Sequence, residues 1–284
     1  MTPRPRVTLI GAGSFAAGLA PVLRKAGYVI DEIISRRPAS SRLRARRLAK
    51  EAGARAVTLE GAAFEAPLLW FCVPDREIRA AARDVARGEL GRVRFAFHSS
   101  GALLSSELEP LRELGIATAS VHPLMTFVPD SQPSLEGVPF ALEGDAAAVR
   151  LARRTVRRIG GESFLLAPGA KTAYHAWATM TSPLQLAFLV TLEEAARAAG
   201  LSRAQARRMS FPIIRQTLTN YARLGPDASF SGPIIRGDAA IVAQHLSVMR
   251  KAPRAREVYL ALARAALRLL PTKNRSELER LLRS

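Results

Sequence analysis

Short apolar runs alternate with helical patterns along the first half of the chain. The runs are almost wholly apolar, which is typical of strands buried in a parallel sheet, and the segments between them repeat apolar residues every three or four positions, as helices do. This alternation predicts an α/β fold with a doubly wound, mostly parallel sheet. Strands are predicted at residues 7–10, 28–34, 54–59, 67–73, 93–97, 116–121, 138–142 and 163–166, with helices at 14–25, 40–52 and 145–159 and another that starts at Asp75.

From residue 168 onward the strand pattern is lost and helical patterns follow one another. This change predicts an all-α carboxy-terminal domain over residues 168–284, after an α/β domain over residues 1–167. The helical patterns cover residues 171–199, with an interruption at Ser182 and Pro183, and then residues 202–224, 234–249, 253–270 and 276–282.

The first predicted strand runs straight into a glycine turn that opens a helix. Gly11 provides a turn that a side chain would obstruct, Gly13 lets backbone approach a ligand, and Ala16 is small enough for the helix to pack on the strand. A helix start also offers unpaired N–H donors, which suit a pyrophosphate. A tight turn without a ligand is the alternative. The turn predicts a Rossmann-type dinucleotide-binding domain, with cofactor contacts from Gly11, Ala12, Gly13, Ser14, Phe15 and Ala16.

The end of the second strand indicates which dinucleotide fits, because side chains there meet the adenosine ribose. An NAD site favours a carboxylate that accepts from the ribose 2′-hydroxyl, whereas the 2′-phosphate of NADP favours cations and hydroxyls. The chain has Ser35, Arg36 and Arg37 at this point, and Asp31 and Glu32 precede the apolar part of the strand. These residues favour NADP, unless the two arginines merely belong to an arginine-rich chain.

Other strands also end at polar or glycine-bearing corners. In an open parallel sheet, the carboxyl ends of the strands meet at one edge, where ligands bind. His98 and His122 stand at two such ends, and each could bind substrate in the crevice or simply belong to a capped turn. Further cofactor contacts are expected from the corners after the fourth and fifth strands, namely Cys72, Val73, Pro74, Ser99 and Ser100.

The composition allows two domains and argues against a dedicated nucleic-acid groove. The chain has 284 residues, 48% of them hydrophobic, and a net charge of +18. Only five of its 42 lysines and arginines are lysines, and aromatic residues make up 6%. A general arginine bias fits better than nucleic-acid recognition. With one cysteine, no apolar leader and no membrane-length apolar run, we expect a cytoplasmic protein with no specific nucleic-acid or membrane partner.

Several motifs together resemble a known group of proteins. They lie at residues 10–13, 98–101, 121–124, 171–175, 231–238 and 245–246. With them the chain resembles the superfamily of 6-phosphogluconate, 3-hydroxyisobutyrate, ketopantoate and pyrroline-5-carboxylate reductases and dehydrogenases. It is more closely similar to bacterial Rossmann-like proteins with a carboxy-terminal domain of unknown function, which are described as NADP oxidoreductases. The resemblance implies NADP(H) as cofactor, ketopantoate reduction as one candidate activity, and a homodimer formed through the helical domain.

The resemblance also implies a catalytic pair at the start of the helical half. In the superfamily, a lysine early in the first long helix of the second domain faces the nicotinamide, and an asparagine follows one turn later. Lys171 stands at that position, but His175 replaces the asparagine, with both on one helix face. Either residue could be the acid, because an imidazole can exchange protons near neutral pH. The alternative is an exposed lysine beside a hydrogen-bonded core histidine.

Arg236 and Asp238 follow a Gly-Pro turn and are candidates for substrate binding. Arg236 could bind a carboxylate in a bidentate way while Asp238 orients it, or the two could form a structural pair with Asp238 capping the next helix. The four histidines lack the spacing of a zinc signature, so we expect no metal.

The leading hypothesis is an NADPH-dependent reductase of a small oxo-acid, ketopantoate-like, or imino-acid. The alternative is an NADP-binding sensor or regulatory protein with weak or no turnover, which the histidine at position 175 motivates.

Overall fold

The computed structural model describes residues 4–129 and 131–283 of the chain. Contacts divide it into two compact units, one that ends at Thr179 and one that begins at Met180. The first unit contains the sheet and the second contains helices.

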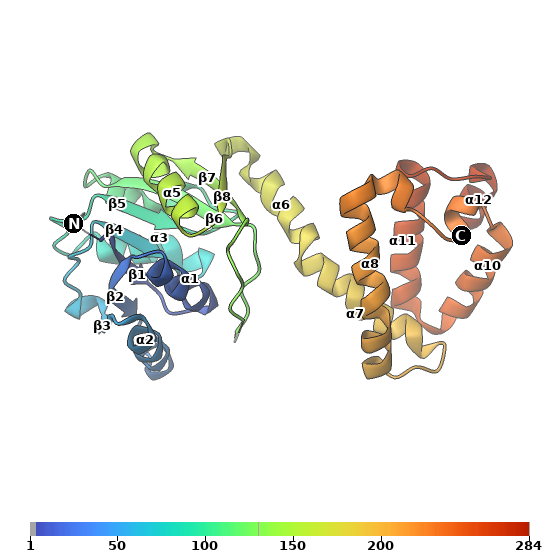
Figure 1. The fold of residues 1–284 in the computed structure, drawn as a ribbon, viewed down its shortest axis with the longest axis horizontal. Coiled ribbons are helices and arrows are strands. Elements are labelled where there is room, and N and C mark those ends of the chain that lie inside the picture. The colour runs from blue at the N-terminus through green and yellow to red at the C-terminus, as the bar shows by residue number, and fades with distance from the viewer. Residues whose placement is uncertain (1–3, 130, 284) are drawn as a thin grey trace. The chain divides into compact units, whose positions relative to one another are not determined.

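Within the described residues, the first unit is built on one eight-stranded sheet with the order β3-β2-β1-β4-β5-β6-β7-β8 (Figure 1). The strands from β3 to β6 are parallel, whereas β7 is antiparallel to β6 and parallel to β8. The strand order reverses between β1 and β4, so a crevice forms at their carboxyl ends. The bounds are β1 (Arg6–Ile10), β2 (Val29–Ser35), β3 (Arg55–Thr58), β4 (Leu68–Phe71), β5 (Phe95–His98), β6 (Ala117–Pro123), β7 (Pro139–Gly144) and β8 (Glu162–Leu165).

Helices cover both faces of this sheet (Figure 1). Successive side chains of a strand point to opposite faces, so Trp70 and Phe71 of β4 lie in two different cores. The core with Trp70 includes side chains from α1 (Ser14–Lys25), α2 (Ala39–Ala52) and α5 (Ala146–Arg158). The core with Phe71 includes side chains from α3 (Asp75–Val85), α4 (Glu109–Arg112) and the 3-10 helix η2 (Ser105–Leu108).

The second unit is helical throughout its described part. It is preceded by α6 (Lys171–Thr181), most of which belongs to the first unit. None of the helices that the structure describes has both the length and the apolar character needed to cross a membrane. The helices after α6 are α7 (Pro183–Arg197), α8 (Arg203–Ser229), α9 (Pro233–Arg236), α10 (Ala239–Val248), α11 (Pro253–Leu269) and α12 (Arg275–Leu282). Helices α10, α11 and α12 share a buried apolar core made of Val242, Leu246, Leu260, Ala263, Leu267, Leu278 and Leu282.

The fold class predicted from the sequence is confirmed: a mostly parallel α/β sheet precedes an all-helical region. The predicted helix over residues 234–249 is instead two helices, because Gly237 adopts a φ of 74° between them. The functional division at residues 167 and 168 stays a prediction. By contacts, α6 begins in the first unit, since Lys171 and Tyr174 are buried there.

Candidate functional site

The glycine turn after β1 has a geometry that only glycine supports. Gly11 has a φ of 107°, and a Cβ on it would lie 2.6 Å from the carbonyl oxygen of Cys72. Gly13 caps the start of α1, where no side chain bonds the free N–H groups of the first turn. The turn therefore presents uncapped N–H donors at the edge of the sheet, which is an arrangement that binds anions.

A pocket of about 650 Å³ lies at the carboxyl ends of β1, β2 and β4. This volume is in the range of ligand sites in proteins. Nine residues predicted to contact the cofactor line it together: Gly11, Ala12, Gly13, Ser35, Arg36, Arg37, Cys72, Val73 and Pro74.

The remaining predicted cofactor residues, Ser14, Phe15, Ala16, Ser99 and Ser100, lie outside this lining in the part of the chain that the structure describes. Ala16 is buried at the sheet, and the Phe15 ring contacts that of Phe127 edge-on at 5.1 Å. The hydroxyl of Ser99 accepts a hydrogen bond of 2.9 Å from the Trp70 indole. These contacts hold the side chains of Phe15 and Ser99 in place next to the glycine turn.

The arginines at the end of β2 are paired with carboxylates in the same pocket. Arg36 donates to Glu77 of α3 at 2.8 Å, and Arg37 donates to Glu60 at 2.5 Å. Glu60 belongs to the 3-10 helix η1 (Leu59–Gly61). Its hydrogen bond from Arg37 lowers the pKa of the Glu60 carboxyl to about 2, so this carboxylate is ionised at neutral pH. At the end of the pocket beside β2, each of the two arginines is therefore paired with a carboxylate.

Sequence reasoning missed several residues of this pocket. Ser41 and Arg44 of α2 line it, and the Arg44 guanidinium lies 3.3 Å from the Ser41 hydroxyl. Their spacing of three puts both on one helix face, which is the only signal that the sequence carries. Glu60 and Glu77 carry no local signal, because separate elements bring them to the arginines.

The two acidic residues early in β2 are engaged elsewhere. Asp31 pairs with Arg6 at 2.9 Å. Glu32 is 2% exposed and accepts hydrogen bonds from the backbone of Ala63 and Phe64. Neither lines the pocket among the described residues.

A second polar cluster surrounds Lys171, at the start of α6. Its ammonium donates to the hydroxyl of Ser120 on β6 and lies 3.8 Å from a carboxylate oxygen of Glu143 on β7. The Lys171 side chain is almost wholly buried, with 3% of the residue exposed. Burial lowers its pKa to about 8, although Glu143 and Asp75 act in the opposite direction. This ammonium is therefore easier to deprotonate than that of an ordinary lysine.

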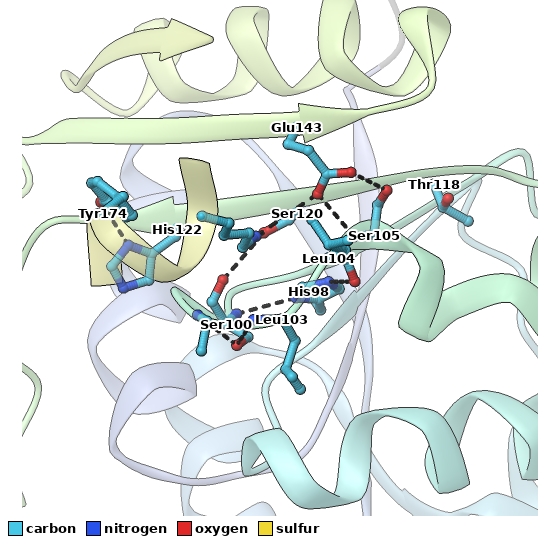
Figure 2. Close-up of polar contacts among 12 residues, drawn as sticks. His98, Ser100, Leu103, Leu104, Ser105, Thr118, Ser120, His122, Glu143 and Tyr174 are labelled. Atoms are coloured by element: carbon cyan, nitrogen blue, oxygen red, sulfur yellow. Dashed lines mark hydrogen bonds and ion pairs between the residues drawn. The ribbon is translucent and has the colours of Figure 1, made fainter. Parts of the chain in front are cut away.

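Hydrogen bonds connect this cluster to the loop after β5, as Figure 2 shows. Ser105 donates through its backbone and its hydroxyl to Glu143, at 2.9 and 2.6 Å. Ser120 donates to the carbonyl of Ser100 at 3.2 Å, and the Ser100 hydroxyl donates to Asp75 at 2.7 Å. Lys171 thus belongs to a hydrogen-bond network that also holds Ser100, in the loop after β5.

His98, a predicted substrate-binding residue, is fully buried at the end of β5. Its Nε2 donates to the carbonyl of Leu104 at 2.9 Å, and its Nδ1 accepts from the Ser100 N–H at 3.1 Å (Figure 2). These partners define a neutral imidazole, because a carbonyl only accepts and an N–H only donates. Burial, with repulsion from Lys171, lowers the pKa of His98 to about 3. In this geometry His98 supports the loop.

His122 and His175 converge at Gly101. A Cβ on Gly101 would lie 2.7 Å from Nε2 of His122 and 2.6 Å from Cδ2 of His175, so a side chain here would displace both rings. The other ring nitrogen of His122 lies 2.8 Å from the Tyr174 hydroxyl (Figure 2). Burial lowers the pKa of His122 to about 4. The structure thus brings two of the predicted site residues together at the sheet edge.

Arg236 and Asp238 form an ion pair of 2.8 Å on the second unit. Asp238 is the residue that precedes α10, but its side chain makes no capping hydrogen bond there. Within the described residues, no group of three or more histidine, cysteine, aspartate or glutamate side chains could hold a metal ion.

These features define a class of protein: a Rossmann-type sheet with a ligand pocket at its strand ends, followed by a helical unit. Two family models match the chain, and the second match begins within the sheet unit. Residues 1–123 match a Rossmann-like domain, and residues 138–266 match a domain of unknown function, DUF2520. The chain thus carries a Rossmann-like domain followed by a DUF2520 domain, which confirms the resemblance seen in the sequence.

Solved structures with this fold match almost the whole chain. A proposed NADP oxidoreductase from Bacteroides fragilis has 21% identity and a TM-score of 0.76, over 92% of this chain and 97% of that chain. A protein from Thermotoga maritima has 23% identity and a TM-score of 0.70, over 98% of each chain. A reductive aminase from Aspergillus terreus, in complex with NADPH and ethyl-5-oxohexanoate, has 18% identity and a TM-score of 0.63, over 94% of each chain. A search of curated proteins found no match.

Proposed function

We propose that this protein is an NADPH-dependent reductase of a small oxo-acid, ketopantoate-like, or imino-acid substrate. The observation that carries the proposal is the pocket in which a glycine turn, an uncapped helix start and two arginines lie together. The helix start suits the pyrophosphate of the cofactor, and the guanidinium groups of Arg36 and Arg37 suit its 2′-phosphate. Arg44 adds a third cation at the same end.

The ends of β5 and β6 support the proposal, because they lie close to this pocket along the sheet. β5 and β6 are the second and third strands from β1, so their ends lie roughly 10 to 15 Å from the glycine turn. NADPH, when bound, supplies a hydride to the carbon of a carbonyl or imine. Residues at the ends of β5 and β6, among them His122, can then meet the oxygen or nitrogen of that group.

Hydride transfer leaves charge on this oxygen or changes it on this nitrogen, so the chain must supply an acid and an anchor. We assign these tasks to Lys171 and His175. The ammonium of Lys171 is buried against Ser120 and Glu143, whereas His175 is half-buried beside Gly101. Arg236 and Asp238 stay candidates for binding the substrate carboxylate.

The comparisons support the same chemistry. The reductive aminase from Aspergillus terreus was solved with NADPH and an oxo ester, and the protein from Bacteroides fragilis is described as an NADP oxidoreductase. Both share the fold of this chain.

The proposal is tested by titrating the protein with NADPH and NADH and by following NADPH loss with ketopantoate, pyruvate and 1-pyrroline-5-carboxylate. The wild type should bind NADPH more tightly than NADH. In the double variant Arg36→Ala, Arg37→Ala, NADPH affinity should fall by roughly 30- to 100-fold while NADH affinity stays the same, because charged hydrogen bonds to the phosphate are lost.

A matched control is the double variant Arg42→Ala, Arg46→Ala. It removes the same charge from exposed positions of α2 that do not line the pocket in the described chain. Unchanged selectivity in the Arg36 and Arg37 variant would remove the basis of the NADP assignment. Tight NADPH binding without turnover of any of the three compounds would favour the sensor instead.

We also propose a homodimer that forms through the helical unit and functions in the cytoplasm. Large apolar side chains are exposed on α7 and α8, among them Leu186 at 63%, Phe211 at 64% and Ile213 at 67%. Extended exposed apolar patches in soluble proteins mark interaction surfaces. A partner copy would cover them.

A further inference from the structure

We infer that Tyr174 fixes the tautomer of His122, so that the Nε2–H of a neutral imidazole donates a hydrogen bond to the carbonyl oxygen or imine nitrogen of the substrate. His122 is then the group that polarises the double bond, and Tyr174 is a positioning residue. No proton leaves His122 in this step. The inference rests on the proposed reductase function and names a site for its substrate.

The first support is the pairing of the two side chains. The Tyr174 hydroxyl lies 2.8 Å from Nδ1 of His122, and the rings meet edge-on at an interplanar angle of 86° (Figure 2). Tyr174 is 7% exposed, and His122 is the one hydrogen-bond partner of its hydroxyl among the described residues. A buried hydroxyl is stable only when its proton has an acceptor. The phenol therefore donates to Nδ1, and the imidazole proton is on Nε2.

The second support is the charge state of the pair. Burial, together with repulsion from Lys171 and His175, lowers the pKa of His122 to about 4. Burial raises the pKa of Tyr174 to about 12. Both side chains are therefore neutral across the physiological range. A neutral imidazole with one fixed N–H is a hydrogen-bond donor that needs no protonation before each turnover.

The third support is where Nε2 points. It lies beside Gly101 in the loop after β5, where a Cβ would come within 2.7 Å of it. Within the described residues, no hydrogen bond engages this nitrogen. The ends of β5 and β6 belong to the sheet edge where ligands bind in folds of this type. A donor that is rigidly held and unpaired at such an edge is suited to an oxygen on which negative charge develops.

The variant Tyr174→Phe tests the positioning role, because it removes only the hydroxyl and keeps the ring contacts with Phe164 and Trp177. Tyr259→Phe is its matched control, since Tyr259 pairs with His245 in a similar edge-on contact with a hydrogen bond of 3.2 Å. With the compound that the wild type reduces best, Tyr174→Phe should lower kcat about tenfold and leave NADPH affinity unchanged. Tyr259→Phe should change neither.

The tautomer is read directly from the ¹⁵N spectrum of protein labelled at its four histidines. At neutral pH the wild type should show His122 as the Nε2–H form, and Tyr174→Phe should show a mixture of both tautomers. An Nδ1–H form in the wild type overturns the inference, whatever the activity is.

His122 itself is tested with two replacements. His122→Gln keeps an N–H near the Nε2 position and should retain part of the turnover, whereas His122→Leu should lower kcat by roughly 100- to 1000-fold, as loss of one preorganised donor does. If the wild type is active and His122→Leu is equally active with a normal melting temperature, the inference is wrong while the proposed function stands. If the wild type reduces none of the three compounds, both fail together.

Discussion

Lys171 is one of five lysines in a chain that otherwise uses arginine for its positive charge, and it is almost wholly buried. A guanidinium stays protonated in proteins, whereas a lysine can lose its proton when burial lowers its pKa. The pKa of about 8 at Lys171 agrees with this difference. The neighbouring imidazole of His98 is buried too, and burial lowers its pKa to about 3, so it is neutral.

The buried histidines should make the protein sensitive to acid. Unfolded His98 takes up a proton near its ordinary pKa of 6.5, but folded His98 does so only near 3, so the unfolded state binds more protons between these values. The stabilisation is complete above pH 6.5 and decreases as the pH falls. His98 alone should cost about 2 kcal/mol of unfolding free energy between pH 6.5 and about 4.5.

Urea unfolding at a series of pH values measures this effect. His98→Gln should flatten the decrease, because it removes the group that takes up the proton on unfolding. A wild-type stability that stays constant between pH 6.5 and 4.5 would contradict a neutral, buried His98.

At the scale of elements, the phosphate end of the pocket is assembled from separate parts of the chain. The segment directly after β2 supplies Arg36 and Arg37, η1 supplies Glu60, and α3 supplies Glu77. The apolar runs that form the strands could be recognised one by one, because burial within a sheet leaves a local pattern. The carboxylates could not, since only the packing of η1 and α3 beside β2 brings them to the arginines.

Glu60 should therefore weaken NADPH binding by competing with the 2′-phosphate for Arg37. Glu60→Gln should raise NADPH affinity by about threefold at low salt, a modest gain because the pair is exposed, and should leave NADH affinity unchanged. Fluorescence titration with each nucleotide measures both. Glu65→Gln is the matched control. Glu65 also pairs with an arginine, Arg92, but neither residue lines the pocket in the described part of the chain. Equal NADPH affinities in the wild type and Glu60→Gln would refute the competition.

The pairing of residues on neighbouring strands explains why the sequence did not predict the polar cluster around Lys171. Ser120 of β6 stands beside His98 of β5 on one side and Glu143 of β7 on the other. The second of these pairs depends on β7 running antiparallel to β6, which the alternation of strands and helices does not predict. Lys171 and His175 were found by resemblance, but Ser105, Ser120 and Glu143 were not.

At the scale of the whole molecule, the exposed apolar side chains of α7 and α8 predict self-association. Light scattering after gel filtration should give the wild type twice the chain mass of 30.7 kDa. Ile213→Glu should give a monomer, because a charge would be buried in the interface. Leu43→Glu is the control: Leu43 is 70% exposed, but it lies on α2 of the first unit. A monomeric wild type would rule out the proposed dimer.

The sequence by itself determined the α/β fold with its helical continuation, the glycine turn after β1 and the arginines at the end of β2. These features depend on neighbours in the chain, such as apolar periodicity and a strand that leads into a helix start. Only the tertiary structure decided that carboxylates pair with those arginines, that Lys171 is buried on Ser120 and Glu143, and that Tyr174 bonds His122 beside Gly101. Each of these contacts joins residues that are distant in sequence, so strand order, register and packing, rather than local pattern, bring them together.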